Sequence, residues 1–389
     1  YRGGVPLEDM EMIQFHPTTL PSTGVLISEG VRGEGGILYN DDGERFMFER
    51  GYANNEGELA SRDVVSRAEL TEVQEGRGIV DEYVHLDMRH LGEERIVDRL
   101  ENILHLAEDF EGVDGLEEPM PVKPGQHYAM GGIETDENGQ TCIDGLYAAG
   151  ENACVSLHGA NRLGGNALPE LLVFGARAGK HAAGGDMASA KIETGPSARS
   201  EDAAVDASVE LGAVDGSEED VVADGAMTEP ETVMETAVER ERERVEQLLA
   251  EDGTNHAEVR ADVQDTMTEY VNVFRQEDGL KQALEELQRA REAYQDVAVA
   301  DPSRTYNTDL IHTIETRNIL DLAEAITVGA LAREEFRGAH WRKAHQERKD
   351  DEWIKHTMLA WNEGSPELYY KPVILEGDEE TYEPKERSY

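Results

Sequence analysis

Residues 156–166 have the sequence SLHGANRLGGN, and an apolar stretch with helical character follows at about 167–183. Three glycines, at 159, 164 and 165, make the loop before this helix flexible. The first turn of a helix carries unpaired backbone N–H groups and the positive end of the helix dipole. The stretch therefore predicts an anion or cofactor site where the loop enters the helix.

The residues upstream of this loop predict a mixture of strands and helices. Residues 133–149 read as short strands and turns, with a strong turn signal, Asp-Glu-Asn-Gly, at 136–139. Farther upstream, four glycines punctuate two short runs, 37–39 and 45–48, which we expect to form the strands of a hairpin. Residues 59–70 have helical spacing.

The residues downstream of the loop predict an acidic insertion and then long helices. No Lys or Arg lies between Arg199 and Arg240, which indicates a flexible insertion at about 186–229. Thr228 and Glu231 have the spacing of a capping box around Pro230, so we expect a helix to begin there. Two amphipathic helices follow, the second entered from Asn307, and we expect them to pack antiparallel. Their predicted apolar faces consist of Leu280, Leu284, Leu287 and Tyr294, and of Leu310, Ile314, Ile319, Leu322 and Ile326.

Composition excludes several classes of protein. The formal net charge is -47, and 39% of the residues are hydrophobic, which indicates an acidic protein with a packed core. This charge repels nucleic acid and anionic membrane surfaces, and it favours adaptation to high salt over a specific acidic function. Cys142 and Cys154 are too few for a disulfide framework, and a reducing cytoplasm fits them. No apolar run approaches the roughly 20 residues that span a bilayer, and the opening at Tyr1 predicts a fragment or a processed chain.

Four polar clusters are candidates for chemistry. His16 precedes a proline, which holds its backbone extended, although a satisfied core histidine is the simpler alternative. The second cluster runs from Ser28 through Glu29 to Arg32 and is joined by Arg62. Its arginines can grip a carboxylate, or the same residues can form surface salt bridges. The third is His127 before two glycines, and the fourth is Glu151 with the loop around Arg162.

Together, His16, Ser28, His127 and Arg162 offer the donors that a small dianion needs at both of its ends. We predict no metal site, because the twelve histidines are scattered and neither cysteine has a partner at ligand spacing. A serine nucleophile elbow is absent as well. Redox chemistry would therefore need an organic cofactor.

These motifs, in this order, resemble the flavoprotein subunits of succinate dehydrogenase and fumarate reductase, a family that also includes L-aspartate oxidase. The loop at 156–166 is close to the most specific signature of that family. The resemblance continues through 307–308, 337–340, 349–353 and 384–389, and covers nearly everything except the acidic insertion.

The resemblance implies roles for individual residues. His16, Ser28, His127 and Arg162 would bind the dicarboxylate, Arg62 would exchange the proton at the substrate carbon, and Glu29 and Arg32 would extend the proton path to solvent. The cofactor would be FAD, with Glu151 near its ribityl or ribose region and with Asn166, Ala167 and Leu168 facing the isoalloxazine. This chain departs from the family's usual residues at Ser28, Ala167 and Pro169, where Thr, Ser and Leu are commoner.

We therefore expect an α+β or α/β multidomain protein with a partial FAD-binding domain and an inserted capping domain, followed by an antiparallel helical domain and an irregular C-terminal domain. The expected boundaries are 1–9 for a remnant of the FAD-binding domain, 10–124 for the capping domain and 125–185 for the distal FAD-binding part. The remainder is 186–229 for the acidic insertion, 230–335 for the helical domain and 336–389 for the C-terminal domain. Neither a GxGxxG motif nor the histidine that can link covalently to flavin is present, and both are expected upstream of Tyr1.

By resemblance, the function would be oxidation of succinate to fumarate, with a hydride passed to N5 of FAD and electrons passed on to an iron-sulfur subunit and quinone. Membrane anchor subunits would then hold the protein peripherally at the cytoplasmic face of the cell membrane, without insertion of its own. Fumarate reductase and L-aspartate oxidase remain alternatives. An alternative of another class is a non-catalytic binding or assembly protein that lacks the nucleotide module, and the isolated chain is expected to be inactive.

Overall fold

The structure, a computed structural model, describes residues 1–184, 230–250, 253–362 and 364–376. The strands are β1 Leu7–Glu8, β2 Ile13–Thr19, β3 Ile37–Tyr39, β4 Val84–Asp87, β5 Met120–Ala129, β6 Gly132–Glu134, β7 Ala153–Cys154, β8 Lys355–Asn362 and β9 Ser365–Pro372. The α-helices are α1 Gly30–Gly33, α2 Phe46–Glu49, α3 Arg62–Gln74, α4 Glu93–Glu111, α5 Ala167–Ala182, α6 Pro230–Ala250, α7 His256–Tyr270, α8 Glu277–Tyr294, α9 Thr308–Ala332 and α10 Asp350–Trp353. Two short 3₁₀ helices, η1 Gly57–Leu59 and η2 Arg89–Leu91, complete the described elements.

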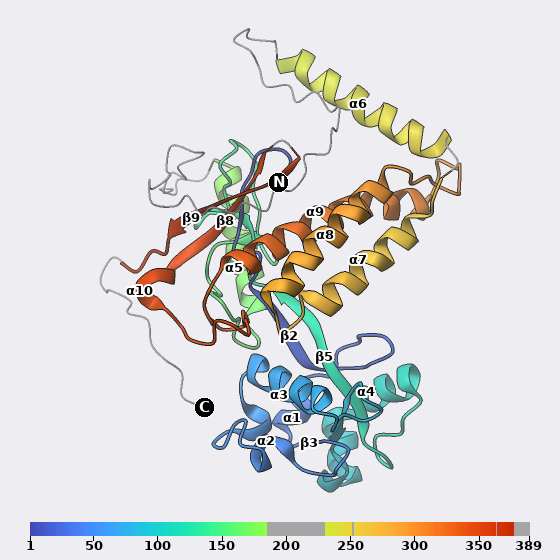
Figure 1. Cartoon of the computed structure of the whole chain (residues 1–389), viewed down its shortest axis with the longest axis vertical. Coiled ribbons are helices and arrows are strands. Elements are labelled where there is room, and N and C mark those ends of the chain that lie inside the picture. Colours follow the sequence, from blue (N-terminus) through green and yellow to red (C-terminus); the bar gives the residue numbers. More distant parts are fainter. Residues whose placement is uncertain (185–229, 251–252, 363, 377–389) are drawn as a thin grey trace.

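Strands β2 and β5 connect two lobes of the molecule (Figure 1). They pair antiparallel and belong to a four-stranded sheet with the order β2-β5-β4-β3. In the lower lobe of Figure 1, helices α1 to α4 surround this sheet around an apolar core that includes Leu38, Val65, Leu86 and Met120. The long strands β2 and β5 thus run from this lobe into the rest of the molecule.

The predicted hairpin between 37–39 and 45–48 is wrong in its second half. β3 is a strand as expected, but it pairs with β4, and residues 46–49 form the helix α2. Phe46 and Met47 are neighbours in sequence and both are completely buried. Consecutive side chains point to opposite faces of a strand, so burial of both in one core favours a helical turn. The helix predicted at 59–70 is present as α3.

A second sheet, with the order β7-β6-β1-β8-β9, joins the start, middle and end of the described chain. β6 and β7 are parallel, whereas β1 pairs antiparallel with both β6 and β8. The hairpin β8–β9 corrects the prediction of an irregular C-terminal segment, because eight residue pairs form a regular antiparallel ladder there. Neither strand alternates between buried and exposed residues, so the sequence lacks the usual strand periodicity.

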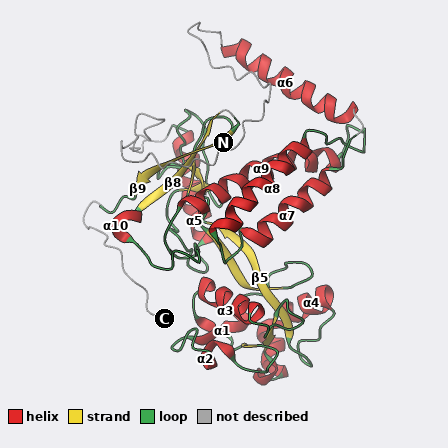
Figure 2. Cartoon of the chain, viewed as in Figure 1, coloured by secondary structure: helices red, strands yellow, loops and turns green. Residues whose placement is uncertain are grey.

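The helical region is confirmed, with α7, α8 and α9 lying side by side (Figures 1 and 2). In α8 the predicted apolar face is buried. The side chain of Asn307 accepts a hydrogen bond from the Leu310 amide and so caps α9, as expected from its position. The buried face of α9 differs from the prediction: Leu322 is exposed, and the buried positions include Thr313, Leu320 and Thr327. Threonine and alanine on this face allow close packing, a signal that a search for large apolar residues misses.

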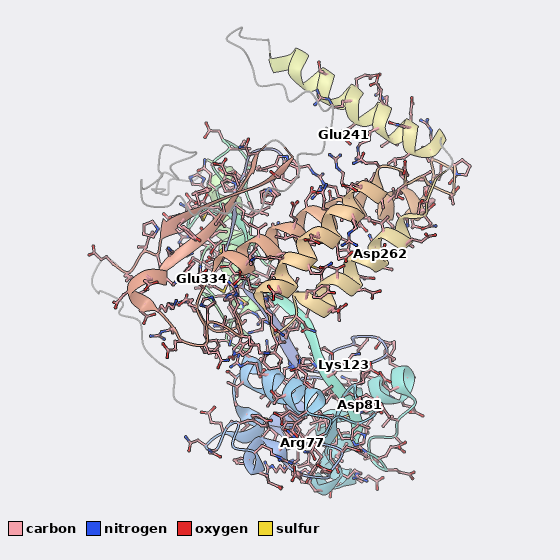
Figure 3. All side chains as sticks on the ribbon, in the orientation of Figure 1. Arg77, Asp81, Lys123, Glu241, Asp262 and Glu334 are labelled. Carbon is pink, nitrogen blue, oxygen red and sulfur yellow. The ribbon has the colours of Figure 1, made fainter. Side chains whose placement is uncertain are left out.

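Helix α6 begins at Pro230, where the capping-box pattern predicted a helix start, while Thr228 and the predicted insertion at 186–229 lie outside the described residues. None of the helices in the described parts of the chain has both the length and the hydropathy of a membrane-spanning segment. Exposed acidic residues occur on both lobes, among them Asp81, Asp262 and Glu334 (Figure 3).

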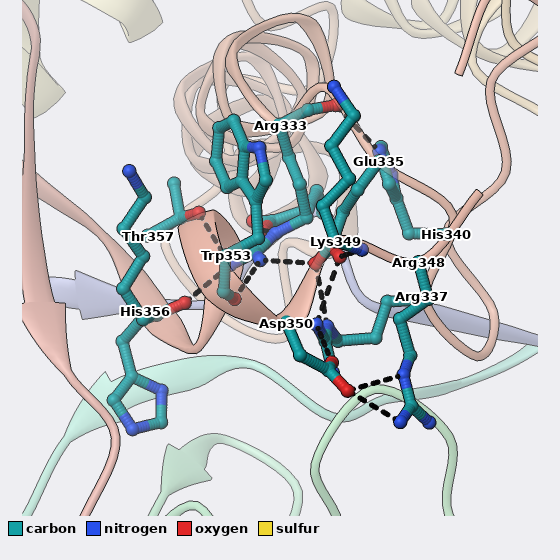
Figure 4. A network of polar contacts seen from close by, with 12 residues as sticks. Arg333, Glu335, Arg337, His340, Arg348, Lys349, Asp350, Trp353, His356 and Thr357 are labelled. Atoms are coloured by element: carbon teal, nitrogen blue, oxygen red, sulfur yellow. Dashed lines mark hydrogen bonds and ion pairs between the residues drawn. The ribbon is translucent and has the colours of Figure 1, made fainter. Parts of the chain in front are cut away.

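A buried ion network fastens the end of α9 to the second sheet (Figure 4). The guanidinium of Arg333 contacts Glu11 at 2.6 Å and Glu335 at 3.1 Å, and it also donates to the hydroxyl of Thr357 at 3.0 Å. Its side chain is buried, and so are both carboxylates. A buried charge needs such full pairing to offset its loss of hydration, so the network holds α9 and β8 in one relative position.

Candidate functional site

The pairing of β2 with β5 brings two histidines together that lie far apart in sequence. His16 lies opposite Gly125 in the ladder, and its ring is 5.1 Å from the ring of His127 in an edge-on arrangement. The amide of Thr18 donates to Nδ1 of His16 at 3.2 Å, so the neutral ring carries its proton on Nε2. The Nε2 atom is buried and has no hydrogen-bond partner among the described residues.

The glycine-rich loop places Arg162 beside this pair. Nη2 of Arg162 donates to Nε2 of His127 at 2.9 Å, and the guanidinium carbon lies 4.2 Å from the centre of the Tyr128 ring. The hydroxyl of Tyr128 in turn donates to buried Glu170 in the first turn of α5, at 2.9 Å. Stacking on an aromatic face fixes the orientation of a guanidinium, so Tyr128 and Glu170 hold Arg162 in place.

Gln14 joins Arg62 to the loop, a role that the sequence did not reveal. Its Oε1 accepts from Nη1 of Arg62 at 2.8 Å, while its Nε2 donates to the backbone oxygen of Arg162 and to Oδ1 of Asn161, each at 2.7 Å. Gln14 lies two residues before His16 on the same strand, so both side chains reach the same face. That spacing of two was the signal that could have identified it.

Glu29 bridges the two predicted arginines at the edge of the cluster. Its Oε2 lies 2.9 Å from Nη2 of Arg62, and its Oε1 lies 3.4 Å from Nη2 of Arg32. The side chain of Glu29 is 44% exposed, whereas those of Arg62 and Arg32 are buried. A β-carbon at Gly164 would come within 2.8 Å of Oε2 of Glu29, so the loop backbone approaches this bridge closely. The chain Arg62–Glu29–Arg32 thus links a buried guanidinium to a carboxylate that water can reach.

The electrostatics of the cluster suit an anion. Burial, together with nearby Arg62, lowers the pKa of His16 to about 2 and that of His127 to about 4, so both imidazoles are neutral at pH 7. Burial and the charge of Arg62 also lower the pKa of Arg162. Nε of Arg62 and Nε of Arg162 join Nε2 of His16 as buried donors without a partner in the described part of the chain. Unpaired buried donors are costly, and a bound carboxylate would satisfy them.

The other predicted site residues lie beside this cluster: Ala167 packs against the apolar group that contains Tyr128, and Glu151 is close enough to Arg162 to oppose the lowering of the Arg162 pKa. Ser28 is exposed, and its hydroxyl accepts from the amide of Gly30 at 3.1 Å, within its own loop. Glu151 is exposed and accepts from the amide of Ala129 at 3.0 Å. Asn166, Ala167 and Leu168 lie at the start of α5, where Leu168 is 70% exposed.

Helix α5 offers a surface that fits a flavin. Besides Leu168, the large exposed apolar side chains of α5 are Leu171, Leu172 and Val173. The start of the helix presents unpaired N–H groups next to this surface. An apolar ring system with polar edges, such as an isoalloxazine, matches this combination, whereas the described residues hold no phosphate-binding glycine loop after a strand. The residues present therefore fit one part of FAD.

Two family models match the chain. The FAD binding domain matches residues 1–168, and the fumarate reductase flavoprotein C-terminal domain matches residues 260–389. Among curated proteins, the fumarate reductase flavoprotein subunit of Haemophilus influenzae is 40% identical over 391 residues, which cover 96% of this chain and 59% of that protein. The succinate dehydrogenase flavoprotein subunit of Rickettsia bellii is 40% identical over 388 residues, covering 96% and 58%.

Solved structures agree with these matches. A quinol-fumarate reductase with menaquinol molecules has a TM-score of 0.81 at 37% identity, covering 96% of this chain and 61% of that one. An E. coli quinol fumarate reductase has a TM-score of 0.79 at 36% identity, covering 96% and 60%. The chain thus spans about 60% of the length of the relatives that it matches. The FAD-binding model and the flavoprotein relatives identify FAD as the cofactor, and the chain belongs to the family of succinate dehydrogenase and fumarate reductase flavoprotein subunits.

Proposed function

We propose that this chain is the substrate-binding part of a flavoprotein subunit that interconverts succinate and fumarate. The observation that carries the proposal is the convergence of His16, Arg62, His127 and Arg162, which come from two strands, a helix and a loop. Three of these four side chains keep an unpaired buried donor atom. A four-carbon diacid supplies acceptors for such donors at both of its ends.

In this proposal, the imidazoles and Arg162 bind and orient the two carboxylates. His16 offers the N–H of Nε2, and Arg162 offers its guanidinium, which stacking on Tyr128 holds still. Because both imidazoles are neutral, the positive charge that attracts the dianion resides on the arginines. Ser28 would join them after a change of its side-chain rotamer, since it is exposed and directly precedes Glu29, which contacts Arg62.

Arg62 would exchange the proton at the substrate carbon, with Glu29 and Arg32 as the path to solvent. The contacts Arg62–Glu29 and Glu29–Arg32, at 2.9 and 3.4 Å, support this order. The side chain of Glu29 is 44% exposed, so water can reach its carboxylate. Gln14 positions Arg62 through the hydrogen bond to Nη1.

FAD, when bound, would supply the acceptor for a hydride at N5, that is, for two electrons and one proton together. The start of α5 at Asn166, Ala167 and Leu168 would hold the ring system, and its N–H groups would stabilise negative charge there. Glu151 would contact the ribityl or ribose region, and it is exposed and near the end of β5.

We also propose the division at 10–124, 125–185, 230–335 and 336–389, the first being the capping domain. The core of α1 to α4 around the four-stranded sheet supports a separate capping unit. An iron-sulfur subunit and membrane anchor subunits would carry electrons to quinone and keep the protein peripheral, at the cytoplasmic face. The menaquinol in a solved relative supports a quinone as the electron partner. Because relatives are named both fumarate reductase and succinate dehydrogenase, either direction of turnover fits.

The test is dye reduction by the complete flavoprotein, with succinate and with L-aspartate as substrates. We expect turnover with succinate, little with aspartate, and a loss of about 100-fold or more in kcat for Arg62→Ala. A matched control is Arg67→Ala, on the same helix but paired with Asp63 instead of Glu29. Turnover with aspartate but not succinate would replace the proposal with an oxidase, and a complete protein without flavin or turnover would support the binding or assembly alternative.

A further inference from the structure

A second cluster of ligand-type side chains lies in the five-stranded sheet, outside the proposed substrate site. Glu8 and Asp9 come from β1 and the residue after it, Cys154 from β7, and His356 from β8. All four are at most 8% exposed. The pairing of β1 with β8 and β6, and of β6 with β7, brings these parts of the chain together.

Three of the side chains bring one ligand-type atom each close together, and His356 contacts the two carboxylates of this group. Oxygens of Glu8 and Asp9 and the sulfur of Cys154 all lie within 4.8 Å of one another. Nδ1 of His356 is 2.6 Å from Oδ2 of Asp9 and 3.3 Å from Oε1 of Glu8. Sγ of Cys154 is likewise 3.3 Å from Oε1 of Glu8.

Neighbouring groups hold these side chains in place. The amide of Thr357 donates to the other oxygen of Asp9 at 2.9 Å, and Nε2 of His356 lies 3.5 Å from the hydroxyl of Ser156. Lys371 contacts the second oxygen of Glu8 at 3.3 Å. Such outer contacts are typical of metal centres, where they fix the orientation of each ligand.

We propose that Glu8, Asp9, Cys154 and His356 form a binding site for a borderline-soft divalent cation such as Zn²⁺. Zinc accepts sulfur, imidazole nitrogen and carboxylate oxygen in a tetrahedral arrangement. With ordinary zinc–ligand lengths, the edges of that tetrahedron are about 3.4 Å for N–O and about 3.6 Å for S–O. The His356–Glu8 and Cys154–Glu8 distances, both 3.3 Å, are already close to these lengths. The His356–Asp9 distance of 2.6 Å would increase by roughly 0.8 Å.

Without the cation, protons occupy the ligand atoms of Cys154 and His356. The thiol of Cys154 donates to Glu8, and the hydrogen bond to Asp9 raises the pKa of His356 against the opposing effect of burial. Binding of the cation would release the thiol proton and the Nδ1 proton. With the thiolate formed, three anionic ligands meet a dication, and Lys371 together with Arg333, 3.5 Å from Asp9, lies nearby to offset the remaining charge.

The site would join the beginning, middle and end of the described chain. A ligand that binds only the folded state stabilises it in proportion to its affinity and concentration. The cation would therefore fasten the hairpin β8–β9 to β1 and β7, independently of substrate or flavin.

The experiment is a titration of the metal-free, reduced protein with Co²⁺ and then Zn²⁺, in high salt to suppress weak binding by surface carboxylates. We expect one equivalent of Co²⁺ with a thiolate-to-cobalt charge-transfer band in the near ultraviolet, and displacement by one equivalent of Zn²⁺. The C154S variant should lose the band and bind Zn²⁺ at least about 100-fold more weakly. The matched control is C142S, which alters the other cysteine, a half-buried residue outside the cluster.

An independent variant, H356Q, covers the case in which C154S does not fold. It should weaken binding similarly while shifting rather than abolishing the band, because the thiolate remains. Absence of the band in the wild-type protein would overturn the site. Retention of the band in C154S, or its loss in C142S, would also overturn it.

Discussion

Glu69 tests how a buried carboxyl group without hydrogen-bond partners affects the stability of this protein. It lies on α3, is completely buried, and neither carboxyl oxygen has a hydrogen-bond partner among the described residues. Burial raises the pKa of Glu69 well above its usual range, although the nearby charge of Arg32 opposes the shift. Burial of a polar group without partners costs about 1–3 kcal/mol, so Glu69→Leu should stabilise the protein by about that amount at pH 7. Arg32 retains its contacts with Glu29 and with the backbone oxygen of Glu58.

The pH dependence follows from the direction of this shift. Because the folded-state pKa of Glu69 is above the unfolded one, its contribution to stability is most favourable below the unfolded pKa and is lost as the pH rises through the folded pKa. The advantage of Glu69→Leu over wild type should therefore grow with pH. Urea denaturation at fixed KCl concentration, at pH 5 and pH 8, measures both effects.

Glu72 is the matched control, since it lies one turn along α3 and is equally buried. Burial alone would raise its pKa, but hydrogen bonds from Arg77, Asn40 and Tyr52 lower it to about 2. Glu72→Leu leaves these partners without an acceptor and should cost about 3 kcal/mol at pH 7. Its stabilising effect is present above the unfolded pKa and is lost as the pH falls toward 2. Equal destabilisation by Glu69→Leu and Glu72→Leu would refute the reasoning.

Three further predictions concern the site, a helix start and the surface. Gly164→Ala should lower kcat/KM of the complete flavoprotein by about tenfold or more, because the new methyl group would lie 2.8 Å from Oε2 of Glu29. The thermal stability of the variant should change little, and an unchanged kcat/KM would contradict the prediction. Asn307→Ala should lower the free energy of unfolding by about 1–2 kcal/mol, since Asn307 caps α9 and also donates to the backbone of Asp301 and Ser303. A urea titration that shows no loss of stability would contradict this prediction. With a formal net charge of -47, the protein should gain stability as KCl is raised from about 0.1 to 2 M, and a falling urea midpoint over that range would contradict the predicted adaptation to salt.

The sequence predicts elements well where one local rule decides them. The glycine loop and α5 follow from glycines before an apolar run, and the start of α9 follows from the capping side chain of Asn307. The predicted strand at 45–48 failed because the burial of both Phe46 and Met47 depends on the core around them, which no local pattern records. The strand β9 begins and ends near prolines and does not alternate between buried and exposed residues, so only its ladder with β8 defines it.

For the site as well, local sequence indicates which residues to choose but not how they lie relative to one another. Candidate residues could be chosen by type and motif, yet the approach of His16 to His127 depends on the register of β2 against β5. Gln14 is not among the candidates predicted from the sequence, because its role lies in contacts with Arg62 and with the loop of Arg162, both distant in sequence. Exposed Ser28 shows that a motif position does not fix where a hydroxyl points.

The most direct measurement is a crystal structure of the complete, flavin-loaded protein with fumarate bound. It should place one carboxylate on Nε2 of His16 and the other on the guanidinium of Arg162, with Arg62 against the carbon chain and the start of α5 beside the flavin ring. Fumarate bound at another surface, with Nε2 of His16 and Nε of Arg62 still unpaired, would contradict the proposed convergence on a single diacid.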